Sequence, residues 1–493
     1  MIKPNWILQR TKLSPGNVAL IDIINDERWT YKKLEEEINH WVQFFEQQGA
    51  RKGDRIVVLS HNRKELFAIM FACGILGLIY VPLNWRLSVI EWEELLKDAD
   101  ARLLIYEFAF EERIKPFTFM ETHPLETVPP ADGKLANAPT ISKDDPWLMI
   151  YTGGTTGKPK GVILTHESVN TNAINTIVSW SLSEKDVTIN YMPLFHTGGI
   201  NALSIPILMA GGTVVVGRTF DEEEALRATD KYKATISLFV PTMYQRIIET
   251  DYFKQSDFPS MNVFLSGGAP CPPKIYRAFQ EKGLAFKEGY GLTEAGPNNF
   301  FIRPEVAAKK IGSVGKNMLF NEVKVVREDG SPCGVNEVGE LYLKGKHLFS
   351  HYWNKEKETK EAFCGEWFKT GDLAKYDEDG DYYIVGRKKD MIITGGENVY
   401  PQEVENCLLG NGWINEAAVI GVPDEKWGEK VVAFITLEDD VPFDEDTLKR
   451  YCRKYLGDYK VPKQFFVIDS LPKTDVGKID KNSLLERFLK GVV

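Results

Sequence analysis

The sequence predicts an α/β protein with a large N-terminal domain and a small α+β domain at the C-terminal end. Up to about residue 300, β-rich apolar runs such as RIVVLS (55–60) alternate with helical patterns such as YKKLEEEINHWVQFFEQQG (31–49). This alternation is typical of doubly wound, parallel sheets covered by helices. From 312 to 385, short strands between turns, such as GELYLKG (339–345), indicate an antiparallel sheet or barrel. After GRKKD (386–390) helices and strands mix again, which predicts a second domain.

Size and composition exclude several classes of function. The chain of 493 residues is long enough for more than one domain, and its net charge of −10 gives no reason to expect a nucleic-acid partner. Its six cysteines lie far apart, without a Cys-x-x-Cys pair or zinc-finger spacing, as is typical of reduced thiols in the cytosol. The N-terminal stretch MIKPNWILQRTKLSPGN lacks the apolar core of a signal peptide. We therefore expect a cytoplasmic protein.

One apolar segment raises the question of a membrane span. Leu66–Leu83 contains no charged residue and is just long enough to cross a bilayer. Gly74, Gly77 and Pro82 interrupt the run, and basic flanks that would orient a span are missing. We interpret the segment as a buried helix that leads into a buried strand, and expect no transmembrane segment.

Two helices are predicted in the C-terminal domain. PQEVENCLL (401–409) has Pro401 at the first helical position, where proline is favoured. Further on, an apolar stripe at helical spacing is made by Leu448, Tyr451, Cys452, Tyr455 and Leu456. The basic residues between them predict either a solvated helix face or a site for a polyanionic ligand.

The stretch YTGGTTGKPKG (151–161) has the composition of a phosphate-binding loop but not the Walker pattern. Only three residues separate Gly153 from Gly157, and Lys158 is followed by Pro159 instead of a magnesium-binding hydroxyl. Both flanks, PWLMIYT and KGVILTH, are predicted strands, so the loop joins two strands and the next helix starts later. Glycine amides, threonine hydroxyls and lysine suit an anion. By composition alone, a flexible polar hairpin loop is an equal alternative.

Three further segments put polar residues at apparent strand ends, where ligands collect in open α/β sheets: LSGGAPCP (265–272), EGYGLTEAG (288–296) and KTGDLAKYDEDG (369–380). Glu294 is suited to hold magnesium, and Asp372 to accept hydrogen bonds from ribose. The run DEDGD (377–381) lacks the glycine and glutamate that a calcium loop needs, so a turn is predicted. His196 has no partner at metal spacing, which favours a structural role. Neither Gly-x-Ser-x-Gly nor His-Glu-x-x-His occurs.

Taken together and in order, the motifs resemble those of the adenylate-forming superfamily, which includes acyl-CoA synthetases, luciferases and peptide-synthetase adenylation domains. The resemblance spans nearly the whole chain. The motifs are YTGGTTGKPKGVILTH, PLFHTGG, SGGAP, GYGLTE, GELYLKG, WFKTGDL, GRKKDMIITGGENVYPQEVE and LPKTDVGKIDK. It implies a large domain of doubly wound sheets with a distorted β-barrel, and a small mobile C-terminal domain. It also implies activation of a carboxylate with Mg-ATP to acyl-AMP and pyrophosphate, followed by acyl transfer to coenzyme A.

The resemblance assigns roles by position. Thr293 bonds the α-phosphate, Glu294 and Thr152 hold magnesium, Asp372 and Arg387 fix the ribose, and Lys478 bridges the α-phosphate and the substrate carboxylate. Adenine is flanked by Gly268, Ala269, Pro270 and Tyr290, beside Gly289 and Gly291. The pyrophosphate loop consists of Thr152, Gly153, Gly154, Thr155, Thr156, Gly157 and Lys160.

The resemblance also implies domain movement. Lys389 matches the hinge, so that residues 1–386 form the adenylation domain, 387–389 the hinge and 390–493 a lid that carries Lys478. Such a hinge lets one site first exclude water and then admit a thiol. Coenzyme A contacts are implied for Gly395, Gly396, Trp427, Tyr459 and Lys463, with a looser match at the last three.

The acid is less well defined than the reaction. PLFHTGG lacks the aspartate that binds an amino acid's ammonium group, which disfavours amino acids. His196 becomes a gate of the acyl pocket and counts among the catalytic candidates, with Phe239 and Gly267 in the pocket wall. The first candidate is a medium- or long-chain fatty acid, followed by an aryl acid or o-succinylbenzoate. A luciferase-like oxygenase and a scaffold protein without catalytic activity remain alternatives. Peripheral membrane contact and a homodimer are open partner predictions.

Overall fold

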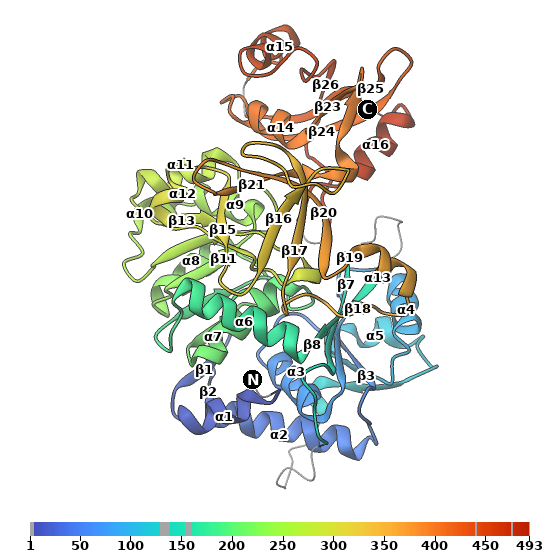
Figure 1. The fold of residues 1–493 in the computed structure, drawn as a ribbon. Helices are drawn as coiled ribbons and strands as arrows, with labels where there is room; N and C mark the ends of the chain where they lie inside the picture. Colours follow the sequence, from blue (N-terminus) through green and yellow to red (C-terminus); the bar gives the residue numbers. More distant parts are fainter. Residues whose placement is uncertain (1–3, 129–138, 153–158, 439–440, 475–476, 493) are drawn as a thin grey trace.

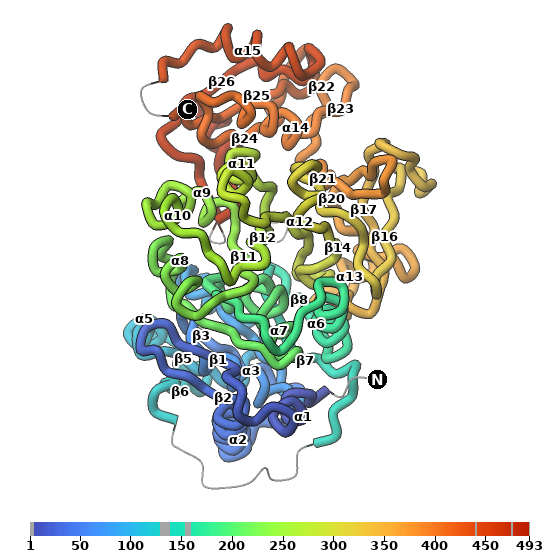
Figure 2. Tube along the Cα trace, turned by 90° about the vertical axis from the view of Figure 1, so that its left-hand side faces the viewer, coloured from blue at the N-terminus to red at the C-terminus, as the bar shows by residue number. Residues whose placement is uncertain are grey.

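The computed structural model describes residues 4–128, 139–152, 159–438, 441–474 and 477–492. Its strands form four sheets, and the last sheet belongs to a separate lobe at the C-terminal end of the chain (Figures 1 and 2). The large domain, the antiparallel sheet within it and the small C-terminal domain agree with the predicted fold class.

Two mostly parallel sheets form the base of the large domain, as the sequence predicts. The first has the order β13-β12-β11-β9-β10-β1-β2 and is parallel except for β2. The second has the order β18-β8-β7-β4-β3-β5-β6, in which β8 alone runs antiparallel to its neighbours β7 and β18. The strands of the first sheet are β1 Val18–Asp22, β2 Arg28–Thr30, β9 Val187–Asn190, β10 Thr213–Val216, β11 Ile236–Phe239, β12 Val263–Ser266 and β13 Phe286–Glu288. Those of the second are β3 Arg55–Leu59, β4 Ile79–Pro82, β5 Leu103–Tyr106, β6 Glu121–Pro124, β7 Pro146–Thr152, β8 Lys160–Thr165 and β18 His351–Tyr352.

Helices cover both sheets, and three apolar cores lie between these layers. The helices of the large domain are α1 Trp6–Leu13, α2 Tyr31–Gln47, α3 Glu65–Leu76, α4 Val89–Asp98, α5 Glu111–Ile114, α6 His166–Trp180, α7 Ser204–Ala210, α8 Glu222–Lys231, α9 Pro241–Glu249, α10 Asp251–Gln255, α11 Pro273–Glu281, α12 Pro304–Ala307 and α13 Glu356–Ala362.

The apolar segment from Leu66 to Leu83 is part of this core. It forms α3, whose residues from Leu66 onward are all buried, and then β4 in the middle of the second sheet. Gly77 ends the helix in the left-handed conformation, with φ +68°. Gly74 lets the Trp147 ring approach, since an added Cβ would lie 2.8 Å from its Nε1. Among the described residues, no helix has the length and apolarity that a membrane crossing requires.

The third sheet is antiparallel and occupies the predicted part of the chain. Its order is β14-β15-β21-β20-β17-β16, with β19 beside β20 and register shifts in three pairs. These irregularities bend the sheet. Its strands are β14 Phe300–Phe301, β15 Ser313–Asn317, β16 Glu322–Val326, β17 Gly339–Lys344, β19 Phe363–Cys364, β20 Trp367–Tyr376 and β21 Tyr382–Arg387.

The C-terminal lobe holds the fourth sheet, in the order β23-β22-β25-β24, with β26 parallel to β25. Its elements are β22 Ile392–Thr394, β23 Glu397–Val399, α14 Pro401–Leu409, β24 Ile414–Asp424, β25 Gly428–Leu437, α15 Glu445–Arg453, β26 Gln464–Val467 and α16 Lys481–Leu489. α14 begins at Pro401 as predicted. The other helix prediction was too long: α15 ends at Arg453, so Tyr455 leaves the apolar face and is 68% exposed.

Candidate active site

The predicted phosphate loop joins two antiparallel strands, as the sequence indicates. β7 and β8 pair with Thr152 opposite Lys160, and α6 begins only at His166. The hydroxyl of Tyr151 donates to Asp98 at 2.7 Å, which braces the β7 side of the loop. Predicted loop residues outside the described part of the chain are Gly153, Gly154, Thr155, Thr156 and Gly157.

Lys160 lies at the start of a short chain of contacts that ends at Glu294. Its Nζ is 4.9 Å from the centroid of the Tyr352 ring, and the Tyr352 hydroxyl donates to Glu294 Oε1 at 3.0 Å. Glu294 and the buried Thr293 belong to a single 3₁₀ turn, Thr293–Ala295, next to β8. Burial raises the pKa of Glu294, while the Tyr352 hydrogen bond and Arg387 oppose that shift. The structure thus brings Lys160, Thr293 and Glu294 together.

The predicted adenine residues follow the ends of two neighbouring parallel strands, β12 and β13. The amide of Gly289 donates to the Ser266 carbonyl at 2.8 Å, which sets the two loops side by side. Gly268 has φ +83°, a conformation that favours glycine. At Gly291, a Cβ would lie 2.2 Å from the Pro297 carbonyl group, so only glycine fits. After Gly268 come Ala269, which is half-buried, and Pro270, which is exposed.

A buried carboxylate below these loops was missed by the sequence analysis. Glu288 accepts hydrogen bonds from the Tyr276 hydroxyl at 2.7 Å and from the Cys271 amide at 3.1 Å. Burial raises the pKa of Glu288 to about 7, against the effect of the two hydrogen bonds. Glu288 therefore ties the loop that contains Cys271 to the end of β13. An acidic residue in a short β-strand is the only sequence signal for it.

The predicted ribose residues meet across the antiparallel sheet. Asp372 on β20 is opposite Arg387 on β21, and Arg387 Nε lies 3.4 Å from Asp372 Oδ1. The hydroxyl of Tyr290 donates to Asp372 Oδ2 at 2.5 Å, so an adenine residue and a ribose residue contact each other. Burial raises the pKa of Asp372, and Arg387 is the largest influence that lowers it.

Lys478 reaches this site from the C-terminal lobe. Its ammonium group lies close enough to Arg387, Asp372 and Glu294 for their charges to shift its pKa. Burial and Arg387 lower the pKa of Lys478, and the two carboxylates raise it. At the preceding Gly477, a Cβ would lie 3.3 Å from Thr242 Oγ1 of α9, so this turn packs against the large domain.

His196 lies within the electrostatic reach of Lys478, which the sequence pattern around a lone histidine does not reveal. Its Nδ1 accepts the Gly198 amide at 3.1 Å, which leaves Nε2 to carry the proton of a neutral ring. Burial, and then the charge of Lys478, lower the pKa of His196 to about 4. Asn62 fixes the segment before His196, since its amide group bonds the Met192 carbonyl and the Leu194 amide at 2.9 and 2.8 Å.

The predicted acyl-pocket residues Phe239 and Gly267 do not lie on the same side of the sheet. The Phe239 ring is fully buried and packs edge-on against Tyr244 in the core under α8, α9 and α11. The residues on either side of it point the other way: Leu238 lies 3.3 Å from the position of a Cβ at Gly267, and Val240, which directly follows β11, lies 3.4 Å from one at Gly268. Alternation of the extended chain thus turns Leu238 and Val240 toward the site glycines, and Phe239 away from them.

The predicted hinge and coenzyme A residues lie at and beyond the end of β21. Lys389 is exposed in a 3₁₀ turn, Lys388–Asp390, between the last strand of the third sheet and the first strand of the fourth. Gly395 has φ +59° and its amide donates to the Trp427 carbonyl at 2.8 Å, while Gly396 has φ +85°. Tyr459 is exposed, and the Lys463 ammonium group donates to the Asp458 carbonyl at 3.1 Å, so within the described residues Lys463 bonds its own loop and not the residues around Lys478.

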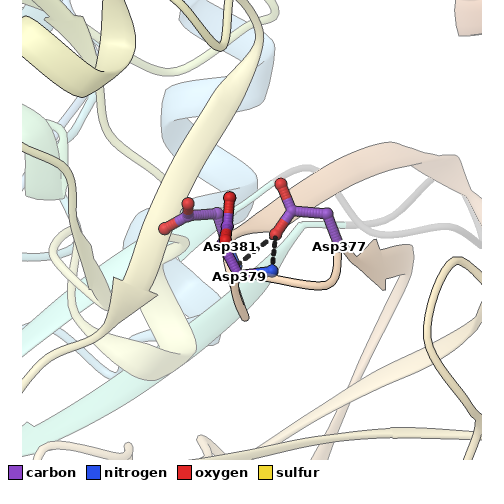
Figure 3. A group of neighbouring side chains, drawn as sticks. All are labelled: Asp377, Asp379 and Asp381. Atoms are coloured by element: carbon purple, nitrogen blue, oxygen red, sulfur yellow. Dashed lines mark hydrogen bonds between the residues drawn. The ribbon is translucent and has the colours of Figure 1, made fainter.

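The aspartate run forms a turn, as predicted, and a lysine already pairs with its carboxylates. Asp377, Asp379 and Asp381 point their carboxylates toward one another (Figure 3). The ammonium group of Lys310 lies 2.7, 2.7 and 2.6 Å from these three carboxylates. Lys310 therefore takes the place that a cation would need.

Comparison with known proteins gives the family. The family model described as AMP-binding enzyme matches residues 8–353, and the model of the AMP-binding enzyme C-terminal domain matches residues 403–478. The chain therefore belongs to the adenylate-forming superfamily of AMP-binding enzymes, as its motifs indicate. Within that superfamily it is an AMP-forming acid:CoA ligase, because the similar curated proteins are CoA ligases and synthetases along their whole length.

Three relatives illustrate the range of acids. The chain is 36% identical to a feruloyl-CoA synthase of Amycolatopsis sp, with 98% of both chains covered. It is 33% identical to the long-chain-fatty-acid–CoA ligase FadD13 of Mycobacterium tuberculosis, again over 98% of both. Among solved structures, the o-succinylbenzoate CoA synthetase of Bacillus subtilis, in complex with its acyl-adenylate intermediate, has a TM-score of 0.89 at 31% identity and 98% coverage of both chains.

Proposed function

We propose that the chain activates an apolar carboxylic acid with ATP and then transfers the acyl group to coenzyme A. In the first step a carboxylate oxygen bonds the α-phosphorus while the bond to pyrophosphate breaks. In the second the thiol sulfur bonds the acyl carbon, AMP leaves, and the thiol proton is released. The placement of Lys478 carries this proposal, because a lysine from the other lobe lies among Arg387, Asp372 and Glu294.

The charges of the site suit the first step. A carboxylate and the α-phosphate repel each other, so fixed positive charge must face the place where negative charge develops. Lys478 is a point charge on a flexible stem and can bridge both anions. Arg387 and Tyr290 hold Asp372 in place for the ribose hydroxyls, at 3.4 and 2.5 Å.

A magnesium ion fits the donor set. The Glu294 carboxylate and the Thr152 hydroxyl offer the oxygen ligands that hard cations prefer, and Glu294 Oε1 is held by Tyr352. The bound ion would neutralise charge on the leaving phosphates.

For the second step we propose that the lobe beyond residue 389 rotates. The 3₁₀ turn that contains Lys389 is exposed, and a short turn between two sheets is suited to absorb the change of backbone angles. Rotation would withdraw Lys478 and bring Gly395, Gly396 and Trp427 toward the adenylate, with Tyr459 and Lys463 at the coenzyme A nucleotide.

A medium- or long-chain fatty acid is the first candidate for the acid, from the sequence motifs. An aryl acid is the second, and it is favoured by the similarity to proteins named feruloyl-CoA synthase and o-succinylbenzoate CoA synthetase. The neutral His196 ring and the apolar side chains of Leu238 and Val240 suit the acyl group of either acid.

The test is pyrophosphate release measured over a panel of fatty, aryl and dicarboxylic acids, each with and without coenzyme A. Release that depends on one class of acid, and that turns over only with coenzyme A, is expected. Turnover with oxygen uptake and light in place of coenzyme A would support a luciferase-like reaction. Absence of acid-dependent release across the panel would contradict the proposal.

A further inference from the structure

A segment that no sequence motif singled out connects two parts of the candidate active site. Residues 349–353, here called the 349–353 bridge, leave the third sheet and add β18 to the edge of the second sheet, beside β8. The Phe349 amide donates to the Glu294 carbonyl at 2.7 Å. The Trp353 amide donates to the Gly161 carbonyl at 2.8 Å, directly after Lys160. The bridge thus holds Glu294 at one end and the strand that follows the phosphate loop at the other.

Tyr352 is the residue of the bridge that reaches a functional side chain. Its hydroxyl donates to Glu294 Oε1 at 3.0 Å, and its side chain is only 8% exposed. The ring packs against Phe349 at 4.8 Å, and the Tyr352 amide donates to Thr359 Oγ1 at 3.0 Å, so backbone and ring are fixed independently of the Glu294 carboxylate. A donor in a fixed position restricts the rotamers of the carboxylate that accepts from it.

Lys160 contacts the same ring. Its ammonium group lies 4.9 Å from the ring centroid, a cation–π distance, so one aromatic side chain touches both a loop lysine and the glutamate. The other flank of the loop is joined to the bridge as well. Asp98 accepts from the Tyr151 hydroxyl at 2.7 Å through its carboxylate, and from Trp353 Nε1 at 3.0 Å through its carbonyl.

We propose that Tyr352 is a positioning residue that keeps the Glu294 carboxylate at a fixed place relative to the Lys160 ammonium group. The metal at Glu294 and the phosphates at Lys160 then bind together. This inference rests on the proposed function of Glu294 as a magnesium ligand. The contacts of the Tyr352 side chain that carry this role are those with Glu294 and Lys160. Tyr352 acts through Glu294 and through the place that it gives to Lys160.

The test compares Tyr352→Phe with a matched control, Tyr252→Phe. Tyr252 also donates its hydroxyl to a carboxylate, that of Asp230 at 2.8 Å, but it lies on α10 in another core. Two binding constants are measured by calorimetry: that of AMP without metal, and the magnesium concentration that half-saturates ATP binding. For Tyr352→Phe we expect about a tenfold rise in the magnesium requirement, since a hydrogen bond to a charged group is worth roughly that factor. The affinity for AMP should stay within about twofold, because AMP lacks the phosphates that face Lys160 and the metal.

A double-mutant cycle with Glu294→Gln provides the second measurement. If Tyr352 acts through Glu294, Tyr352→Phe should add nothing to the magnesium requirement of the Glu294→Gln variant. Equal weakening of AMP and Mg-ATP binding together with a lower melting temperature would show a merely structural role and overturn the inference. An unchanged magnesium requirement would overturn it too. A wild-type protein that binds Mg-ATP normally but releases no pyrophosphate with any acid would instead contradict the proposed function alone.

Discussion

Replacement of Lys478 by alanine separates the two proposed half-reactions. The residue lies on a turn of the C-terminal lobe, and the Lys478 amide donates to Thr474 Oγ1 at 3.2 Å through its backbone, so the turn does not depend on the side chain. The ammonium group is the part that reaches Arg387, Asp372 and Glu294. Lys478→Ala should therefore leave the fold intact and remove one preorganised charge from the adenylation site.

The expected loss of kcat in the Lys478→Ala variant is that of removing one positive charge from a place where negative charge develops in the transition state. Removal of one such group typically lowers kcat by about 10²–10³-fold. Acid-dependent ATP–pyrophosphate exchange should fall by that factor. Thioester formation from preformed acyl-AMP and coenzyme A should change by less than about threefold, since Lys478 is expected to be withdrawn in that step. Exchange within threefold of the wild-type rate would refute the role assigned to Lys478.

The pH dependence of exchange gives an independent check. Burial and Arg387 lower the pKa of Lys478 below the ordinary 10.5 in the nucleotide-free protein, so kcat/KM for ATP in the exchange reaction, which reports the free enzyme, should be lost at a lower pH than for a free lysine. Lys478→Arg should extend activity to higher pH, because a guanidinium group keeps its charge. On the acid side, burial raises the pKa values of Glu294 and Asp372 above 4.5 and 3.8 in the protein without metal or nucleotide, so the acid limb of kcat/KM for ATP should also lie above the ordinary carboxylate range.

Three further substitutions test other parts of the structure. Gly291→Ala places a Cβ 2.2 Å from the Pro297 carbonyl group and should cost about 1–3 kcal/mol of unfolding free energy, measured by denaturant titration, while weakening ATP binding. At Glu288 the folded pKa of about 7 exceeds the unfolded 4.5, so wild-type stability should fall by about 3 kcal/mol between pH 5 and pH 8, and Glu288→Gln should flatten that dependence. Lys310→Ala removes the cation that all three carboxylates share and leaves only Lys316, 3.1 Å from Asp381, so the melting temperature should fall at neutral pH but recover when the carboxylates are protonated at low pH.

The sequence predicted correctly those helices, strands and loops whose structure depends on residues close together in the chain. The uncharged segment after Leu66 was assigned to the core because glycines and a proline interrupt it, and these residues end α3 and shape β4. The phosphate loop was placed between strands from its flanks alone, and β7 and β8 pair around it. In both cases the residues that decide the structure lie within a few positions of one another.

Contacts between distant segments could not be predicted in the same way. Tyr352 and Glu294 are 58 residues apart, and Asn62 reaches Met192 across 130 residues. Neither Tyr352 nor Asn62 belongs to a periodic pattern or a sequence motif that would indicate its partner. The face of β11 was equally undetermined, because the strand is buried on both sides, and a strand that is apolar on both faces does not show which residues point toward a site.

The same geometry explains why the site needs two lobes. Without a nucleotide, burial and the positive charge of Arg387 lower the pKa of Lys478, so the arrangement has an electrostatic cost. Triphosphate adds negative charge at the same place and removes that cost, which favours the lobe position seen here. Once pyrophosphate has left, much of the compensating charge is gone, and the repulsion again disfavours this position of the lobe. In the proposed rotation, a lysine carried by the C-terminal lobe links the charge of the nucleotide to the position of the lobe, which a lysine fixed in the large domain could not do.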